Sequence, residues 1–464
     1  MVLIASVAFL IDIVSNMNYK KPVVIVGAGL CGTMLAVRLA QRGFPVEVFE
    51  KRSDMRTSGV EGGRSINLAL SDRGIKGLSL IGIADKIHPL IIPMNGRMIH
   101  PISGELVLQP YSVRQNECIN SISRGGLNIA LLDEAEKYPN LKLHFNQNCI
   151  NADLTRGIAQ FENTITQQKI SIEGQTIIGT DGSGSAVRQS LFANSANLRF
   201  NFQQSFLEHG YKELHIPDIN GEWQLYKNAL HIWPRGSYMM IALPNLDGSF
   251  TVTLFFPFEG EFGFNSLNTH KKVIDFFNEK FPDAVPLMPN LAEDFFQNPT
   301  SVLGTIKCFP WAANDKALLM GDAAHAIVPF YGQGMNCSFE DVVVFDELLE
   351  NYTDDLKGLF SAFQMARKLN TDAIADLAID NFYEMRDHVA NPLYIKKRKL
   401  ELQLEQTYPN YFSKYAMVTF REDLPYAMAM DKGRRQDELL LQWCQKHEET
   451  DDLNSVMTFL SENM

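Results

Sequence analysis

The sequence contains no C-x-x-C pair, and its net charge is far from basic. Its six cysteines are scattered: Cys31, Cys118, Cys149, Cys308, Cys337 and Cys444. This scatter favours a reducing compartment and argues against a zinc site. The formal net charge of −12 makes a nucleic-acid partner unexpected, so any positive substrate pocket has to be local.

No stretch of the chain is apolar for long enough to span a bilayer. Residues 1–14 are apolar, but they lack a basic start and include Asp12. Met17 is an alternative start just before the first expected strand. We expect a non-essential extension over residues 1–19 and a cytoplasmic protein. A weak membrane tether at this end is the alternative.

The clearest motif is G-x-G-x-x-G, made by Gly27, Gly29 and Gly32. It follows a β-branched apolar run over residues 23–26 and precedes helix-forming residues over 33–42, which end at a glycine. A second apolar strand over 46–49 ends at Glu50. The glycines allow a tight turn, the approach of a pyrophosphate and close helix packing, and the acid suits ribose hydroxyls. This arrangement predicts a dinucleotide site at a helix N-terminus.

Further elements follow from periodicity. Buried strands are expected over 176–179 and 317–320, a hairpin over 91–114, and an antiparallel sheet from alternation over 211–256. A long helix should start near Asn336. Residues from 371 to the end should be mostly helical, with breaks at Pro392, Pro409 and Pro425.

Three strand–turn–helix segments, GAGLCG, TDGSGSAVR and MGDAAHAIVPFYGQGMN, occur in this order. Together they resemble the FAD-dependent aromatic hydroxylases of the para-hydroxybenzoate hydroxylase type. The resemblance implies an α/β fold (α+β overall) with a Rossmann-like FAD-binding domain, an inserted antiparallel-sheet substrate domain and a helical C-terminal region. The implied FAD contacts are Gly27, Gly29, Leu30, Gly32, Glu50, Lys51, Arg124, Asp181, Asp322, Gly334, Met335 and Asn336.

The domain boundaries implied by this resemblance are discontinuous. The FAD-binding domain should comprise residues 20–90, 115–190 and 300–370. The substrate domain should comprise residues 91–114 and 191–299, and the helical region residues 371–464. A helix start near Gly334 should stabilise negative charge on the reduced flavin.

Other strings, among them GRMIH, LQPY, NALHIWP and YAMVTF, resemble the kynurenine-hydroxylating members of that family from about residue 20 to 431. The membrane segment at the C-terminus of the eukaryotic members is missing, so the chain is similar to the soluble bacterial form. The resemblance implies hydroxylation of L-kynurenine to 3-hydroxy-L-kynurenine in tryptophan degradation, with bound FAD, transient NADPH and O2. It implies substrate contacts at Arg97, Tyr111, Phe330, Asn381 and Tyr415. Because the flavin carries the chemistry, no catalytic side chain and no metal are expected.

Alternatives remain for both the residues and the function. Judged alone, Arg97 fits a surface arginine, Tyr111 and Phe330 fit core residues, and Asn381 fits a local cap. His325 fits a structural loop histidine. The aromatic residues of the alternating stretch are expected in the core without a site role: Tyr211, His231, Trp233 and Phe250. The substrate could be another anionic aromatic, or the flavin could be structural or regulatory in a protein that binds a partner.

Overall fold

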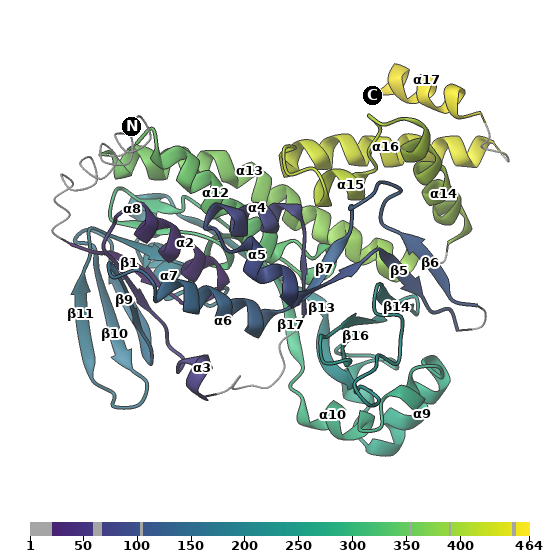
Figure 1. The fold of residues 1–464 in the computed structure, drawn as a ribbon, viewed down its shortest axis with the longest axis horizontal. Coiled ribbons are helices and arrows are strands. Elements are labelled where there is room, and N and C mark those ends of the chain that lie inside the picture. Colours follow the sequence, from purple (N-terminus) through teal and green to yellow (C-terminus); the bar gives the residue numbers. More distant parts are fainter. Residues whose placement is uncertain (1–20, 59–66, 103–104, 353, 389–390, 448–451) are drawn as a thin grey trace, which may run out of the picture.

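Figure 1 shows the protein as a computed structural model. It describes residues 21–58, 67–102, 105–352, 354–388, 391–447 and 452–464. The extension expected over residues 1–19 lies outside these ranges. The described chain combines a parallel sheet with its helices, a second and mostly antiparallel sheet, and a C-terminal group of helices. This is the mixed fold that the sequence predicts.

A six-stranded sheet with the order β18-β19-β12-β1-β2-β8 forms the first layer. Its strands are β1 (Val23–Val26), β2 (Val46–Phe49), β8 (Leu141–His144), β12 (Thr176–Gly179), β18 (Ala312–Ala313) and β19 (Ala317–Leu319). Every residue of β1 and β12 is buried, as expected for apolar strands covered on both faces. Because β19, β12 and β1 are parallel neighbours, the three motif turns that follow them meet at one edge of the sheet.

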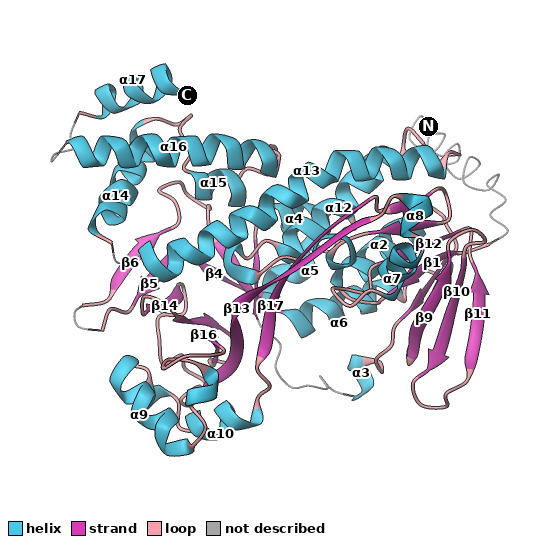
Figure 2. Ribbon diagram, turned by 180° about the vertical axis from the view of Figure 1, so that it is seen from behind, coloured by secondary structure: helices cyan, strands magenta, loops and turns pink. Residues whose placement is uncertain are grey.

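Helices flank this sheet, and α2 packs against α6 and α12. The larger ones are α2 (Leu30–Gln41), α4 (Asp72–Leu80), α6 (Arg124–Ala135), α7 (Ala186–Ala193), α12 (Gly334–Leu349) and α13 (Leu356–Tyr383). Figure 2 shows α13 as a long helix beside α12. It begins well before residue 371, where the sequence predicted helix to start. Its first turns bury Leu359, Phe360 and Phe363 in the core of the parallel sheet.

Two three-stranded sheets adjoin this layer. One has the order β3-β7-β4 and contains β3 (Asn67–Leu70), β4 (Ile91–Met94) and β7 (Ile119–Ser123). The other has the order β11-β10-β9 and contains β9 (Gln147–Asp153), β10 (Ile158–Asn163) and β11 (Lys169–Glu173). The hairpin predicted over 91–114 is therefore split, because β4 pairs with β7 and the hairpin itself starts at Gly96.

The second large sheet has the order β17-β13-β16-β15-β14-β5-β6. Its strands are β5 (Gly96–Ile99), β6 (Val107–Pro110), β13 (Asn201–Ile216), β14 (Leu230–Pro234), β15 (Met239–Pro244), β16 (Phe250–Pro257) and β17 (Ser301–Phe309). The antiparallel pairing predicted over 211–256 is confirmed. The β5–β6 hairpin joins this sheet through a parallel pairing of β5 with β14, which places Arg97 opposite Leu230.

Helices α9 (His270–Lys280) and α10 (Leu291–Gln297) pack with the second sheet. The C-terminal group contains α14 (Pro392–Thr407), α15 (Lys414–Thr419), α16 (Tyr426–Lys446) and α17 (Leu453–Asn463). Pro392 and Pro425 stand at helix starts, where a missing N–H costs nothing. The short helices are α3 (Met55–Ser58), α5 (Ala84–Ile87), α8 (Ser195–Leu198), α11 (Asp322–His325) and the π-helical turn η5 (Glu384–His388). Among the described residues, no helix is both long and apolar enough to cross a membrane.

A buried ion-pair network fastens the third motif turn to its helices. His325 Nε2 lies 2.6 Å from Asp341 Oδ2, and Arg367 Nε donates to Asp341 Oδ1 at 2.7 Å. The Gly321 N–H also donates to this carboxylate. Although burial lowers the pKa of His325, Asp341 raises it more, to about 10. His325, Cys337 and Asp341 could hold a metal by their spacing, but the Asp341 oxygens are already engaged in these contacts. His325 is therefore a protonated histidine with a structural role, as expected from the sequence.

This network predicts a pH-dependent stability. Because the folded protein raises the pKa of His325 from 6.5 to about 10, its stabilisation is complete below pH 6.5 and is lost as the pH rises toward 10. We expect urea titrations between about pH 7 and pH 10 to show a steeper loss of unfolding free energy in the parent than in His325→Gln. The exposed His447 provides a control, since His447→Gln should keep the parent's slope. Equal slopes in the parent and His325→Gln would contradict the assignment.

Candidate active site

A cavity of about 610 Å³ runs between the two large sheets and collects most of the predicted site residues. It is lined by residues from all three motif turns and from strand β5. The predicted residues on its wall are Gly27, Gly29, Leu30, Glu50, Lys51, Arg124, Asp181, Asp322, Gly334, Met335, Arg97, Tyr111, Phe330 and Tyr415. Gly32, Asn336 and Asn381 do not line it. The fold therefore brings together residues that are up to 388 positions apart, from Gly27 to Tyr415.

The first turn shows why its glycines are needed. Gly27 has a φ of +102°, a conformation that other residues rarely adopt. A Cβ on Gly32 would lie 2.1 Å from the Gly27 carbonyl oxygen and 2.3 Å from Thr180 Oγ1. A Cβ on Gly29 would meet no atom within 4 Å and would project into open space. Gly32 therefore serves helix packing, and Gly29 leaves room for a ligand.

Glu50 is held in place beside the same turn. Its Oε2 accepts from the Ala28 N–H at 2.9 Å, and its Oε1 accepts from the Arg52 N–H at 3.0 Å. Each carboxylate oxygen has further lone pairs. The anchored carboxylate thus remains able to accept hydrogen bonds from ribose hydroxyls in the cavity.

The two motif aspartates differ in their surroundings. Asp181 accepts from Ser185 Oγ at 2.5 Å and from the Ala186 N–H at 2.7 Å, so its carboxylate is used at the start of α7. Burial raises the pKa of Asp181. Asp322 is exposed to the cavity, and in the described part of the chain no hydrogen bond to its carboxylate is found. Asp322 is therefore the freer acceptor of the two.

The loop before α12 is fixed by the Asn336 side chain. Its Oδ1 accepts from the Ser71 N–H at 3.0 Å, and its Nδ2 donates to the carbonyls of Ala69 and Gly332, each at 2.8 Å. This amide is fully used inside the protein and is buried. The first residues of α12, Gly334 and Met335, line the cavity instead. Any contact of Asn336 to a cofactor would have to come from its backbone.

Arg97 lies at the other end of the cavity among tyrosines. Its guanidinium carbon is 5.2 Å from the Tyr415 ring centroid and 5.7 Å from that of Tyr111. Arg97 Nε and the Tyr111 hydroxyl are buried without a hydrogen-bond partner among the described residues. Burial lowers the pKa of Arg97, but the neighbouring tyrosines and Glu384 raise it overall. A buried guanidinium whose Nε has no hydrogen-bond partner within the described chain, beside a tyrosine hydroxyl that also has none, suits an anionic ligand.

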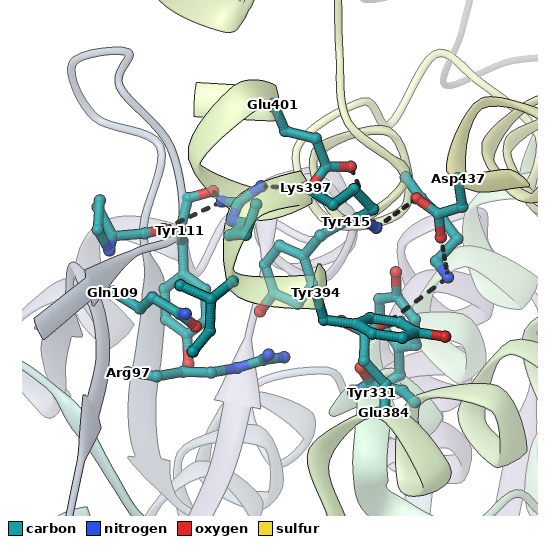
Figure 3. A pocket seen from close by; sticks show the side chains of 15 residues that line it. Arg97, Gln109, Tyr111, Tyr331, Glu384, Tyr394, Lys397, Glu401, Tyr415 and Asp437 are labelled. Atoms are coloured by element: carbon teal, nitrogen blue, oxygen red, sulfur yellow. Dashed lines mark hydrogen bonds and ion pairs between the residues drawn. The ribbon is translucent and has the colours of Figure 1, made fainter. Parts of the chain in front are cut away.

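Phe330 and Asn381 are linked to each other. Phe330 is buried and packs with its ring centroid 4.8 Å from Phe255 and 4.4 Å from Phe382. Asn381 Nδ2 donates to the Phe330 carbonyl at 2.6 Å. Asn381 lines a smaller pocket beside Arg97, which Figure 3 shows. Its amide positions the Phe330 backbone in this structure.

Several wall residues were missed by the sequence analysis. Tyr331 stacks on Tyr415 with a centroid distance of 5.6 Å, and it follows Phe330 directly in the third motif. This place directly after Phe330 is the feature of the sequence from which Tyr331 could have been predicted as a wall residue. The apolar wall from the second sheet includes Leu230, Ile241, Leu243 and Phe255. Alternation alone could not show which face of that sheet meets the cavity. The described cavity walls do not include His231, Trp233 and Phe250, which are buried in the core as expected.

Comparisons with known proteins agree with this architecture. A family model described as an FAD binding domain matches residues 20–218 and 309–367. A kynurenine 3-monooxygenase of Dictyostelium discoideum is 47% identical over 435 residues, which cover 91% of this chain and 92% of that protein. One of Myxococcus xanthus is 46% identical and covers 90% and 89%, respectively. The chain belongs to the kynurenine 3-monooxygenase family. The resemblance seen in the sequence is confirmed.

Solved structures agree on the fold of this family member. The p-nitrophenol 4-monooxygenase of Pseudomonas putida has a TM-score of 0.67 at 15% identity and covers 88% of this chain and 98% of its own. The 2-methyl-3-hydroxypyridine-5-carboxylic acid oxygenase has a TM-score of 0.62 at 20% identity, covering 86% and 95%. At these identities the likeness concerns the fold alone.

FAD is the cofactor of this family, and the residues present fit it. The open space at Gly29, the anchored Glu50 carboxylate and the exposed Asp322 carboxylate lie on the wall of one cavity. The start of α12 lies on the same wall. The space at Gly29 would hold the pyrophosphate of FAD, and Glu50 would hold the ribose. Asp322 would hold the ribitol, and the start of α12 would face the ring when it carries negative charge.

Substitution of Gly32 should affect stability, whereas substitution of Gly29 should affect FAD binding. Gly32→Ala should lower the free energy of unfolding of the apoprotein by about 1–3 kcal/mol, because its Cβ would collide with backbone. Gly29→Ala should leave apoprotein stability unchanged but weaken FAD binding, because its Cβ would occupy ligand space. Thermal unfolding of the apoprotein and FAD titration measure the two effects. Two variants that are equally stable and bind FAD equally would refute this division.

Proposed function

We propose that this protein hydroxylates L-kynurenine to 3-hydroxy-L-kynurenine, using bound FAD and consuming NADPH and O2. The observation that carries the substrate assignment is the buried pair of unpartnered groups, Arg97 Nε and the Tyr111 hydroxyl. Identity of 47% and 46% to kynurenine 3-monooxygenases over most of the chain supports the same substrate. It favours kynurenine over another anionic aromatic or a purely regulatory flavoprotein.

The residues of this chain bind and orient the substrate. Arg97 offers two parallel N–H donors to the α-carboxylate, and Tyr111 adds a hydroxyl donor. Phe330 and Phe255 give the aromatic ring an apolar wall, and Tyr415 stacks with Tyr111 at a centroid distance of 5.0 Å. Asn381 acts through Phe330 by holding its carbonyl.

When bound, FAD supplies electron transfer from NADPH to O2 and the activation of oxygen. The protein contributes water exclusion and positive potential. The wall around Arg97 is aromatic and buried, and the N-terminal end of α12 lies on the wall at Gly334 and Met335. A helix N-terminus favours anions, so this end suits a ring that carries negative charge. We assign no side chain a chemical step. We also assign cofactor binding to the parallel-sheet part and substrate binding to the second sheet.

Steady-state kinetics test the proposal directly. FAD-loaded protein should consume NADPH faster when L-kynurenine is added, and mass spectrometry should identify 3-hydroxy-L-kynurenine as the product. If kynurenine does not stimulate NADPH consumption, or if the product is hydrogen peroxide alone, the proposed activity is wrong.

Arg97 provides the sharpest variant. Arg97→Ala should keep FAD but lose on the order of 3–5 kcal/mol of substrate binding, as for a broken buried ion pair. Arg97→Lys should be intermediate, since lysine keeps the charge but loses the planar fork. Tyr111→Phe should raise the Michaelis constant more mildly. The control substrate is decarboxylated kynurenine. If Arg97→Ala discriminates between the two substrates as strongly as the parent does, Arg97 is not the carboxylate anchor.

A further inference from the structure

A pocket beside Arg97 holds a cluster of charged side chains from the turn η5 and from the C-terminal helices (Figure 3). Its acids are Glu384, Glu401 and Asp437, and its lysines are Lys397 and Lys414. Arg97, Tyr111, Tyr331 and Tyr415 line both this pocket and the larger cavity. The cluster therefore lies next to the place proposed for the substrate carboxylate.

Two of the three acids are occupied by cations of the cluster. Asp437 lies 2.6 Å from Lys397 Nζ and 2.5 Å from Lys414 Nζ. Glu401 lies 3.5 Å from Lys397 and 3.4 Å from Arg398. Both side chains are at most 14% exposed. These two acids neutralise the lysines and leave little capacity for a ligand.

Glu384 differs from the other two acids. Its ion pair to Lys414 is long, at 3.6 Å, and its side chain is 30% exposed. Within the described ranges, no hydrogen bond to its carboxylate is found. Burial opposes its charge, but Lys414, Lys397 and more weakly Arg97 hold the pKa of Glu384 below its usual value. Glu384 is thus a carboxylate with unused acceptor capacity that lines the same pocket as Arg97.

The backbone also directs Glu384 to this place. It opens the π-helical turn Glu384–His388 at the end of α13, and such turns are frequent at functional sites. Asn381 lies three residues before it and lines the same pocket, while Met385 directly after it lines the larger cavity. The end of α13 and the turn that follows it therefore place Asn381 and Glu384 on the smaller pocket and Met385 on the larger cavity.

We propose that Glu384 binds the α-ammonium group of the substrate, so that Arg97 and Glu384 together select an α-amino acid. An α-amino acid carries its carboxylate and ammonium on one carbon, and a pocket whose wall carries both a cation, Arg97, and an anion, Glu384, matches both groups. The inference rests on the proposed function, since it concerns the same substrate. It makes Glu384 a specificity-determining residue that rejects ligands with a carboxylate alone.

The test compares L-kynurenine with desaminokynurenine, the analogue that lacks the α-ammonium group, on FAD-loaded enzyme. Glu384→Gln keeps the size of the side chain and removes its charge. It should raise the Michaelis constant for L-kynurenine by at least ~10-fold, the loss expected for one charge-assisted hydrogen bond. The constant for desaminokynurenine should change less than about two-fold, because that analogue makes no such bond. Glu384→Asp should be intermediate, since it keeps the charge but is shorter.

Glu401→Gln serves as the matched control, because it removes an acid of the same cluster that pairs with Lys397 and Arg398. It should change both Michaelis constants by the same factor. Equal factors in Glu384→Gln as well would overturn the inference and leave the proposed function intact. If the parent shows no kynurenine-stimulated NADPH oxidation, the proposed function fails and the inference fails with it. Should Glu384→Gln not fold, the ratio of the two constants in Glu384→Asp decides in the same way.

Discussion

The close contact of α2 with the first turn at Gly32 is the constraint on which the rest of this structure depends. The turn, the helix and Thr180 approach so closely that no Cβ fits at this position. Thr180 Oγ1 donates to the Val26 and Gly27 carbonyls, which ties the second motif to the first. Because the two turns share this contact, Glu50, Asp181 and the open space at Gly29 face one cavity.

The third motif reaches the same cavity through buried polar contacts. The carboxylate of Asp341 gathers His325, Arg367 and the Gly321 N–H, while Asn336 joins the loop to β3. These groups satisfy one another and leave Asp322 and the start of α12 exposed to the cavity. A polar network of this kind fixes a loop whose own backbone has few regular partners.

The end of the cavity that we propose for the substrate depends on parts of the chain that are far apart. Arg97 comes from a short hairpin that is held by pairing with β14, and its aromatic surroundings come from η4 (Pro329–Tyr331) and α15. The charged cluster on α14, α15 and α16 lines the smaller pocket that Arg97 also lines. Positive and negative groups therefore lie near the part of the wall that carries Leu230, Ile241 and Phe255, an arrangement that would suit the zwitterion proposed above.

The sequence by itself determined the elements and the motifs. Its apolar runs predicted β1, β2 and β12, and its G-x-G-x-x-G pattern predicted the first turn, since these depend on local composition and backbone freedom. The start of α13, the split of residues 91–114 between two sheets and the length of β13 were decided by tertiary packing. The roles of Asp181 and Asn336 were also decided there, because their side chains are engaged by Ser185, Ser71 and Ala69. Only the tertiary structure shows that Glu384 differs from Asp437 and Glu401 in its hydrogen-bonding partners. Which acid keeps free acceptor capacity depends on how Lys397 of α14 and Lys414 of α15 are shared among the three acids. The local sequence does not determine this sharing, because the partners come from different helices.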